Sequence, residues 1–316
     1  MTTDSWTPPS GARILPRGGR RAVRRWRVRR AVLAAAAAAV AIVAAVPGRS
    51  APVAASATLP VPPSLRALAP SPLPRRPAPP PPSRAERERA AVARAMKRFR
   101  FVSAGGARGR TVALTFDDGP SPYTHSLVRV LRRRHVPATF FQVGQMVSAW
   151  PGAAREVRRR GFPVGDHTAG HPPLATLGAG AQRAQVTSTV STLRAVDHSR
   201  RRPDLFRPPY ASFDRDTLRV AREQRMLTVL WDVDSADYTR PGTAQIVRNV
   251  VSHVRPGSIV LMHDGGGPRS QTVAAVPAIV RALRRRGYRF VTVPQMMRVA
   301  PPRRRQKLPP GAGPGG

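Results

Sequence analysis

Two neighbouring carboxylates, Asp117 and Asp118, follow an apolar run in the segment LTFDDGPSPYTH (114–125). Successive side chains of a strand point to opposite sides, but a sharp turn at Gly119 would let both carboxylates reach one cleft. One of them could then bind a divalent metal ion, while the other takes a proton from a water that the ion activates. The alternative is a pair of N-cap residues at the start of the helix that follows Pro122.

His167 and His171 lie four residues apart in the segment HTAGH, and this spacing lets two imidazoles reach one metal ion from a helix or a tight turn. A carboxylate from another strand end would complete a set of two histidines and one carboxylate. Such a set leaves coordination positions open for water and substrate, as catalytic sites do. Two surface histidines without a shared ligand are the alternative.

Other polar groups follow the later apolar runs. Arg207 and Tyr210 belong to the segment RPPY, and His263 and Asp264 close the segment SIVLMHD. In parallel α/β folds, functional groups collect where strands end and loops begin, so these side chains are expected at one edge of a sheet. Three further aspartates in WDVDSADY belong to the same group, namely Asp232, Asp234 and Asp237.

The elements that would position these groups alternate between short, β-rich apolar runs and helical stretches. Strand, helix and strand recur about seven times between residues 111 and 297, which predicts a parallel α/β architecture. About 190 residues suit a closed or nearly closed barrel. An open doubly wound sheet is the second possibility, but no Gly-rich phosphate loop follows the first strand. Expected strands are 111–116, 138–143, 162–167, 204–210, 226–233, 258–264 and 288–293, and expected helices are 124–135, 152–160, 180–196, 214–225, 243–254 and 272–286.

The composition restricts the class of protein. A formal charge of +38 over 316 residues indicates attraction to polyanions, which could be nucleic acid, anionic lipid or an acidic cell-wall polymer, although many of the arginines would simply be solvated. The chain contains no cysteine, which excludes disulfides, thiolate zinc sites, cysteine nucleophiles and a lipid-modified cysteine.

The first hundred residues differ from the rest. A densely basic stretch (13–30) precedes an apolar run (31–46), and Ala55-Ser56-Ala57 offers a small-residue cleavage site. Residues 1–57 are therefore predicted to be a basic N-terminus with a signal peptide or a signal anchor. The protein is expected to be exported, and either secreted or held at the outer face of the cytoplasmic membrane by residues 31–46.

Four further regions follow this export segment. A Pro-rich linker is predicted for residues 58–83, and a basic helix, expected over 84–100, with its connector for residues 84–107. The α/β domain is assigned to residues 108–298 and a basic, Pro- and Gly-rich tail to residues 299–316.

The motifs of the α/β region resemble those of the NodB-type polysaccharide deacetylases, carbohydrate esterase family 4. The family's first motif, TFDDGP, is present at 115–120, and HTAGH (167–171) looks like the second, H-[ST]-x-x-H. RPPY (207–210) is similar to the third motif, DSADY (234–238) to the fourth and LMH (261–263) to the fifth. The resemblance covers about 190 residues in family order. It implies a distorted (β/α) barrel.

The resemblance also implies a role for each matching residue. Asp117 would be the general base, paired with Arg207, which keeps it ionised and aimed. The backbone N–H of Tyr210 would help to hold the oxyanion, and His263 would protonate the leaving amine. Asp237, rather than Asp234, would keep His263 charged. The divalent metal, zinc first and cobalt, manganese or nickel as alternatives, would be bound by Asp118, His167 and His171.

Two positions depart from the family pattern. Tyr238 stands where the family usually has Trp, which could change the shape of the acetyl pocket. Asp166 precedes His167 where Asn is common, and an extra carboxylate near the metal could strengthen cation binding or alter the preference for metals. Neither departure removes a catalytic group.

The resemblance implies a metal-dependent hydrolase acting on carbon–nitrogen bonds other than peptide bonds. It would remove N-acetyl groups from a polysaccharide that contains N-acetylglucosamine and release acetate. Peptidoglycan is the favoured substrate, because export and a cationic surface suit an anionic wall; chitin oligomers and acetylated xylan come next. A cationic wall- or polyanion-binding protein with a weak catalytic site is the alternative of another class. A monomer without a specific nucleic-acid partner is expected.

Overall fold

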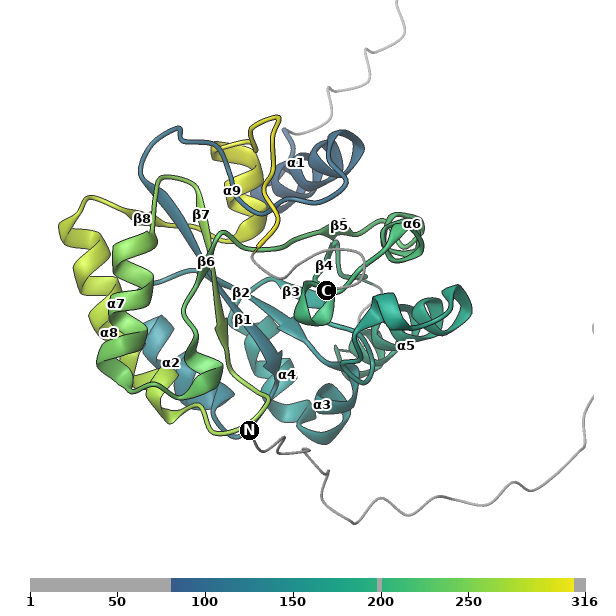
Figure 1. Cartoon of the computed structure of the whole chain (residues 1–316), viewed down its shortest axis with the longest axis horizontal. Helices are drawn as coiled ribbons and strands as arrows, with labels where there is room; N and C mark the ends of the chain where they lie inside the picture. The colour runs from purple at the N-terminus through teal and green to yellow at the C-terminus, as the bar shows by residue number, and fades with distance from the viewer. Residues whose placement is uncertain (1–80, 198–200, 310–316) are drawn as a thin grey trace, which may run out of the picture. The chain divides into compact units, whose positions relative to one another are not determined.

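The computed structural model describes residues 81–197 and 201–309. The predicted export segment, most of the predicted linker and the end of the tail lie outside these residues. Strands occupy the middle of the described part and helices surround them (Figure 1). The strands are β1 (Thr111–Gly119), β2 (Ala138–Gln142), β3 (Val164–Asp166), β4 (Leu205–Phe206), β5 (Leu227–Thr228), β6 (Val233–Asp234), β7 (Ser258–His263) and β8 (Arg289–Phe290).

Helices follow most of the strands, as the sequence predicts, although α3 and α4 both follow β2 and no α-helix separates β5 from β6. The described residues also form single turns of 3-10 helix in loops that follow strands, namely η1 (Leu174–Thr176), η2 (Pro209–Ala211) and η3 (Asp237–Thr239). The α-helices are α1 (Arg84–Arg98), α2 (Thr124–Arg133), α3 (Gly144–Ala149), α4 (Pro151–Arg159), α5 (Ala179–Asp197), α6 (Arg215–Glu223), α7 (Thr243–His253), α8 (Ser270–Arg285) and α9 (Val293–Val299).

The sheet is parallel and curled, in the order β5-β4-β3-β2-β1-β7-β6, with β8 paired to the beginning of β1. The segment before β1 contacts two separate parts of the sheet, because Val102 bridges Val229, directly after β5, and Ala104 bridges Ser258, at the start of β7. This arrangement confirms the prediction of a distorted parallel barrel. The single strand predicted over 226–233 is instead split into β5 and β6, because the chain leaves β4 and crosses to β7 between them.

Two apolar layers stabilise the barrel. Alternate residues of β1 such as Leu114 and Phe116 pack outward with helix residues, while Ala113 belongs to the inner cluster. The inner cluster also contains Val92 of α1 and Met296 of α9, whose helices pack against each other. Each fully buried large side chain contributes about 1.5–3 kcal/mol to the stability of the fold. The interior is therefore filled, and the loops at the strand ends are held on a rigid base.

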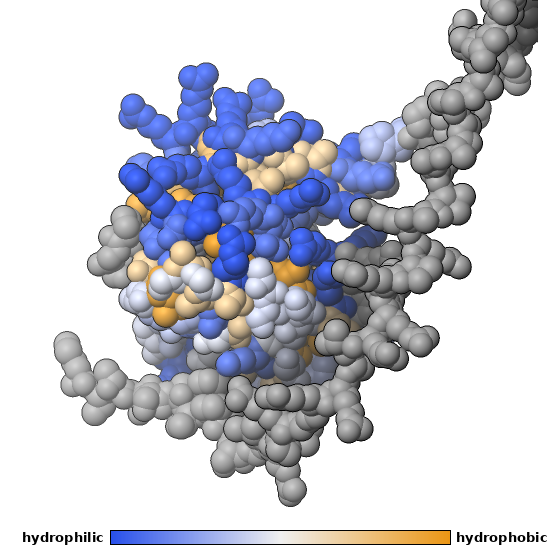
Figure 2. Space-filling view, turned by 90° about the vertical axis from the view of Figure 1, so that its right-hand side faces the viewer, coloured by the Kyte–Doolittle hydropathy of each residue, from blue (hydrophilic) through white to orange (hydrophobic). Residues whose placement is uncertain are grey.

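The surface of the described residues is strongly hydrophilic. Figure 2 shows the face on the right of Figure 1, where hydrophilic residues surround small apolar areas. No helix among residues 81–197 and 201–309 combines the length and the apolar character that a membrane crossing needs.

Candidate active site

The predicted site residues come together because the parallel register aligns the ends of neighbouring strands. Asp117 at the end of β1 is paired with His263 of β7 on one side and with Phe141 of β2 on the other. His167 and Arg207 follow β3 and β4 on the same edge. Residues separated by almost 150 positions in the sequence thus face a common cleft at the carboxyl edge of the sheet.

Asp118, His167 and His171 form a cluster that could hold a metal ion, since one ligand atom from each lies within 4.8 Å of the others. Asp118 Oδ1 is 3.0 Å from His171 Nε2 and 3.3 Å from His167 Nε2. His167 Nδ1 lies 2.7 Å from the carbonyl oxygen of Arg207 and donates to it, so the other ring nitrogen, Nε2, faces the cluster. His171 Nδ1 shares a hydrogen bond of 3.1 Å with the Tyr210 hydroxyl.

The donor set fits a divalent cation. Asp118 Oδ1 is buried and, apart from the two nearby imidazole nitrogens, it has no hydrogen-bond partner among the described residues, which is costly unless a cation or a water satisfies it. Burial opposes the ionisation of Asp118, but the adjacent His167 and His171 outweigh it and hold the pKa of this carboxyl well below its usual range. Two imidazole nitrogens and one carboxylate oxygen suit zinc and similar transition metals.

A bulge explains how neighbouring aspartates can serve one cleft. The register between β1 and β2 shifts between Asp117 and Gly119, and Asp118 has a φ of 69°, in the left-handed region. The sequence placed the turn at Gly119, but the left-handed residue is Asp118. Gly119 is required for a different reason, because a Cβ there would overlap the carboxylate of Asp264.

Close backbone approach fixes Asp118 in this conformation. A Cβ on Gly265 would overlap the carbonyl of Asp118, and a Cβ on Gly266 would overlap its Oδ2. Gly266 itself has a φ of 70°, a backbone conformation that residues other than glycine rarely adopt. The loop after β7 thus positions the carboxylate of the candidate metal cluster.

The loop that carries the histidines is also strained and held by side chains. Thr168 and His171 have φ values of 67° and 60°. Thr168 Oγ1 accepts the backbone N–H of His171 at 3.0 Å, and Asp166 Oδ1 accepts the backbone N–H of Thr168 at 2.8 Å. Left-handed non-glycine residues concentrate at functional sites, where the surroundings over-determine the backbone.

Asp166 therefore has a different position from the one expected for an extra metal ligand. It is fully buried, its Oδ1 supports Thr168, and it does not belong to the three-residue cluster. Burial raises the pKa of this carboxyl well above its usual range, against the effect of the Thr168 N–H. Asp166 thus supports the histidine loop through its hydrogen bond to the backbone of Thr168.

Asp117 pairs with Arg207, as the resemblance implied. Arg207 Nη1 donates to Asp117 Oδ1 at 2.8 Å and to Thr115 Oγ1 at 2.8 Å. The guanidinium is fully buried and also donates to the carbonyls of Val229 and Leu230, each at 3.1 Å. Because these four hydrogen bonds fix the planar guanidinium, the Asp117 carboxylate is held in one orientation. Its other oxygen, Oδ2, faces the histidines and lies 3.9 Å from His167 Nε2.

His263 pairs with Asp237 rather than with Asp234. His263 Nδ1 lies 2.7 Å from Asp237 Oδ1, and Asp237 Oδ2 accepts both the backbone N–H of His263 at 2.9 Å and the Thr272 hydroxyl at 2.7 Å. Burial favours the neutral imidazole, but Asp237, with smaller effects from Asp118 and Asp117, raises the pKa of His263 to about 9. The ring is thus a charged proton donor at neutral pH.

Asp234 has a structural contact instead. Its Oδ1 accepts the backbone N–H of Ala236 at 2.7 Å, in the turn that leads to η3. Asp232, the third aspartate of this segment, accepts from Ser258 Oγ at 2.9 Å and from the backbone N–H of Ile259 at 2.7 Å. These two carboxylates shape the crossing from β5 to β7.

Two exposed tyrosines flank the polar groups. Tyr210 is 65% exposed, has a φ of 57° and donates its backbone N–H to no acceptor among the described residues. That N–H is therefore available to a ligand. Tyr238 is 48% exposed, and its ring centroid lies 5.5 Å from that of His263 at a steep angle, so an aromatic side chain stands beside this imidazole.

Asp264 is a buried group to which the sequence assigned no role. Its Oδ2 accepts from Thr124 Oγ1 at 2.5 Å, and its backbone N–H donates to the carbonyl of Asp117 at 3.0 Å. Its Oδ1 has no hydrogen-bond partner within the part of the chain that the structure describes. Burial raises the pKa of Asp264 to about 7, and the nearby Asp118 and Asp117 act in the same direction. The available signal was its position directly after His263, at the end of β7.

Asp117 and His263 can transfer protons, and they lie beside a candidate cation cluster at the carboxyl edge of a parallel barrel. This arrangement is typical of a hydrolase. The profile of the family described as polysaccharide deacetylase matches residues 104–229. A peptidoglycan-N-acetylglucosamine deacetylase of Bacillus cereus is 37% identical over 192 residues, which cover 60% of this chain and 89% of that protein. A chitooligosaccharide deacetylase of a Bradyrhizobium strain is 36% identical over 199 residues, with 59% and 90% covered.

Solved structures agree with the sequence comparisons. The crystal structure of a peptidoglycan N-acetylglucosamine deacetylase superimposes with a TM-score of 0.61 at 32% identity and covers 66% of this chain and 97% of that one. The chain belongs to the polysaccharide deacetylase family. The prediction of a polysaccharide N-deacetylase on a distorted barrel is thereby confirmed at the level of the family.

Proposed function

We propose that the protein is a metal-dependent deacetylase that removes N-acetyl groups from an N-acetylglucosamine polymer and releases acetate. One observation carries this proposal: a possible metal cluster, a carboxylate held by a guanidinium and a charged imidazole lie together at one edge of the sheet. An amide is hydrolysed when a water attacks its carbonyl carbon and the amine leaves with a proton. The cleft holds one group for each of these proton transfers.

A divalent cation bound by Asp118, His167 and His171 would supply Lewis acidity for the attacking water and the amide carbonyl. Zinc is the favoured ion because two imidazoles and one carboxylate are typical ligands of catalytic zinc, with cobalt, manganese or nickel as alternatives.

Asp117 accepts the proton of the attacking water. Its carboxylate is held by Arg207 at 2.8 Å and faces the histidine cluster, which is the orientation that a general base needs. Arg207 is a positioning residue, because its contacts go to Asp117 and to buried oxygens of the barrel.

His263 gives a proton to the amine as the carbon–nitrogen bond breaks. Its pairing with Asp237 keeps the ring protonated at neutral pH and turns Nε2 away from the aspartate. The free backbone N–H of Tyr210 stabilises the negative charge that develops on the carbonyl oxygen. Base and acid therefore reside on different strands and do not compete for one proton.

Peptidoglycan is the proposed substrate, with chitin oligomers second and acetylated xylan third. Relatives named for peptidoglycan and for chitooligosaccharides are almost equally similar, so family likeness alone does not separate the first two. The formal charge of +38 favours an anionic polymer, because long-range attraction concentrates such a substrate at the protein. Export by residues 1–57, which lie outside the described part, belongs to the same proposal.

The test is acetate release from peptidoglycan, chitin oligomers and acetylated xylan, by the full chain with and without added zinc. The proposal expects release from at least one N-acetylglucosamine polymer that stops with a chelator and returns with zinc. A folded, metal-loaded protein that releases no acetate but still binds polyanions would instead be the cationic binding protein.

A further inference from the structure

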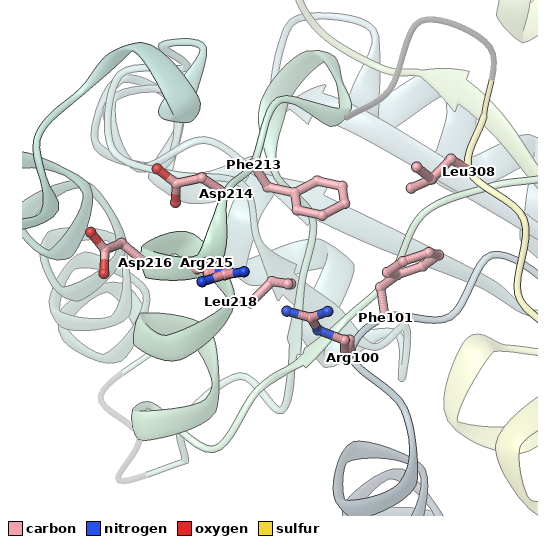
Figure 3. Close-up of a pocket in the computed structure, with 8 residues that line it drawn as sticks. All are labelled: Arg100, Phe101, Phe213, Asp214, Arg215, Asp216, Leu218 and Leu308. Carbon is pink, nitrogen blue, oxygen red and sulfur yellow. The ribbon is translucent and has the colours of Figure 1, made fainter. Parts of the chain in front are cut away.

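A second hollow lies outside the candidate active site, at the amino-terminal end of α6. Its volume is about 680 Å³. Figure 3 shows Phe101, Phe213, Leu218 and Leu308 around it, with the guanidinium of Arg100 at its edge. The rings of Phe101 and Phe213 lie 5.8 Å apart between centroids and form an aromatic wall. None of the candidate catalytic residues lines this hollow.

The acidic and the basic residues around the hollow differ in whether they already have partners. Asp214 is occupied, because it caps α6 by accepting the Thr217 N–H at 2.8 Å and also accepts from Gln182 Nε2 at 2.9 Å. Asp216 is occupied as well, in an ion pair of 2.8 Å with Arg219. In Figure 3 both carboxylates point away from Phe213 and Leu218.

The two lining arginines have no such partners. Neither Arg100 nor Arg215 makes a side-chain hydrogen bond or ion pair with another residue of the described part of the chain, and both are exposed. Their guanidiniums are therefore free to bind carboxylates from outside, in the bidentate geometry that suits them. The hollow combines an apolar wall with two available cations, which fits a small ligand that carries both methyl groups and carboxylates.

One loop connects this hollow with the catalytic edge. The loop after β4 carries Tyr210, whose hydroxyl contacts His171, and three residues later Phe213, which lines the hollow. Phe213 belongs to a small apolar cluster that Trp231 packs against, and the Arg207 guanidinium lies 5.5 Å from the centre of the Trp231 ring. A polymer bound at the catalytic edge could thus extend a branch to the hollow.

We propose that this hollow binds the acidic peptide that branches from a peptide-bearing glycan while the glycan lies in the catalytic cleft. This inference rests on the proposed function and deepens it, because peptidoglycan carries such peptides and chitin does not. Alanine-like methyl groups would contact the wall formed by Phe101 and Phe213, and the peptide carboxylates would pair with Arg100 and Arg215. An extended two-residue branch spans about 7 Å, and the loop that it would follow carries Tyr210 and Phe213 three residues apart.

The test compares one substrate that carries the peptide with two that do not. Acetate release is measured on a soluble peptidoglycan oligomer with L-alanyl-D-glutamate branches, on the same oligomer with its peptides removed, and on a chitin tetramer. The double variant Arg100→Gln/Arg215→Gln should raise KM for the peptide-bearing oligomer about tenfold, since two charge-assisted contacts are lost. Its kcat on that oligomer, and its kcat and KM on the other two substrates, should not change.

A control variant separates the hollow from general electrostatic attraction. Arg281→Gln/Arg285→Gln removes two exposed charges from α8 and should leave all three substrates unaffected. Equal losses in both double variants would overturn the proposal in favour of long-range attraction. Equal losses on all three substrates in the first variant would show a structural role only.

Direct binding keeps this proposal distinct from the proposed function. Titration calorimetry with the isolated L-alanyl-D-glutamate dipeptide should show binding to the parent protein and to Arg281→Gln/Arg285→Gln, and loss of binding in Arg100→Gln/Arg215→Gln. Binding without any acetate release would preserve the hollow's assignment and refute the deacetylase activity. Activity on chitin without any peptide binding would do the reverse.

Discussion

His263 Nδ1 lies 2.7 Å from Asp237 Oδ1, and this contact decides the protonation state of the imidazole at neutral pH. Replacing Asp237 by Asn removes the main charge that raises the pKa of His263 to about 9. The pKa should then fall toward its ordinary value near 6.5. Because the protonated ring is the proposed acid, the alkaline limb of kcat/KM should move down by about two pH units.

The same pair predicts how stability depends on pH. A histidine whose pKa is raised on folding contributes stability that is fully present below pH 6.5 and is lost as the pH rises through about 9. Thermal unfolding of the parent and of Asp237→Asn between pH 6 and 10 measures this loss. Curves that remain parallel over the whole range would contradict a charged His263.

Arg207 should matter for stability as well as for activity. Its guanidinium is fully buried against Asp117, so Arg207→Met would leave a buried carboxylate without its partner. Breaking one side of a buried ion pair costs about 3–5 kcal/mol, and chemical denaturation should show a loss of that order. The double variant Arg207→Met/Asp117→Asn should recover part of it, since the orphaned charge is removed as well. A double variant as unstable as the single one would refute this explanation.

Gly266 should control metal affinity without touching the metal. A Cβ at this position would overlap Asp118 Oδ2, and the backbone φ of 70° disfavours alanine. Changing a residue that supports a metal ligand typically lowers metal affinity by about 10–100-fold. Gly266→Ala should therefore weaken zinc binding by this factor in a competition titration. Gly180→Ala in α5, where an added Cβ meets nothing within 4 Å, should bind zinc normally. Equal affinities in both variants would exclude this positioning role.

Asp264 should make the fold less stable as the pH rises. Its pKa is raised from 3.8 to about 7 on folding, so the folded protein binds more protons than the unfolded chain between these values. The parent therefore loses stability between pH 4 and 7, and Asp264→Asn should lose less over the same range. Urea unfolding with a chelator present measures the difference without metal ligation. A difference that does not change with pH would contradict a neutral Asp264.

Much of this site could be predicted from the sequence because its groups follow apolar runs. The motif around Asp117 and Asp118, the histidine spacing and the later Arg207 and His263 indicated one strand edge, and the parallel register brings them there. The catalytic roles and the domain boundaries themselves stay predictions.

Other features depend on contacts that no local pattern encodes. The left-handed backbone of Asp118 depends on Gly265 and Gly266, which approach it from a loop almost 150 residues later. In the same way, adjacency to His167 does not reveal that the Asp166 carboxylate accepts the backbone N–H of Thr168 and lies outside the three-residue cluster. The split between β5 and β6 follows from where β7 lies, and an apolar run alone does not show that.

The division of labour between Asp117 and Asp118 is tested most directly by acetate release together with zinc binding in two single variants. Asp117→Asn should bind zinc like the parent and lose about 10²–10⁴-fold in acetate release from N-acetylglucosamine oligomers, the contribution typical of a general base. Asp118→Ala should lose zinc binding and activity together. A zinc-loaded Asp117→Asn protein that releases acetate at the parental rate would contradict the account.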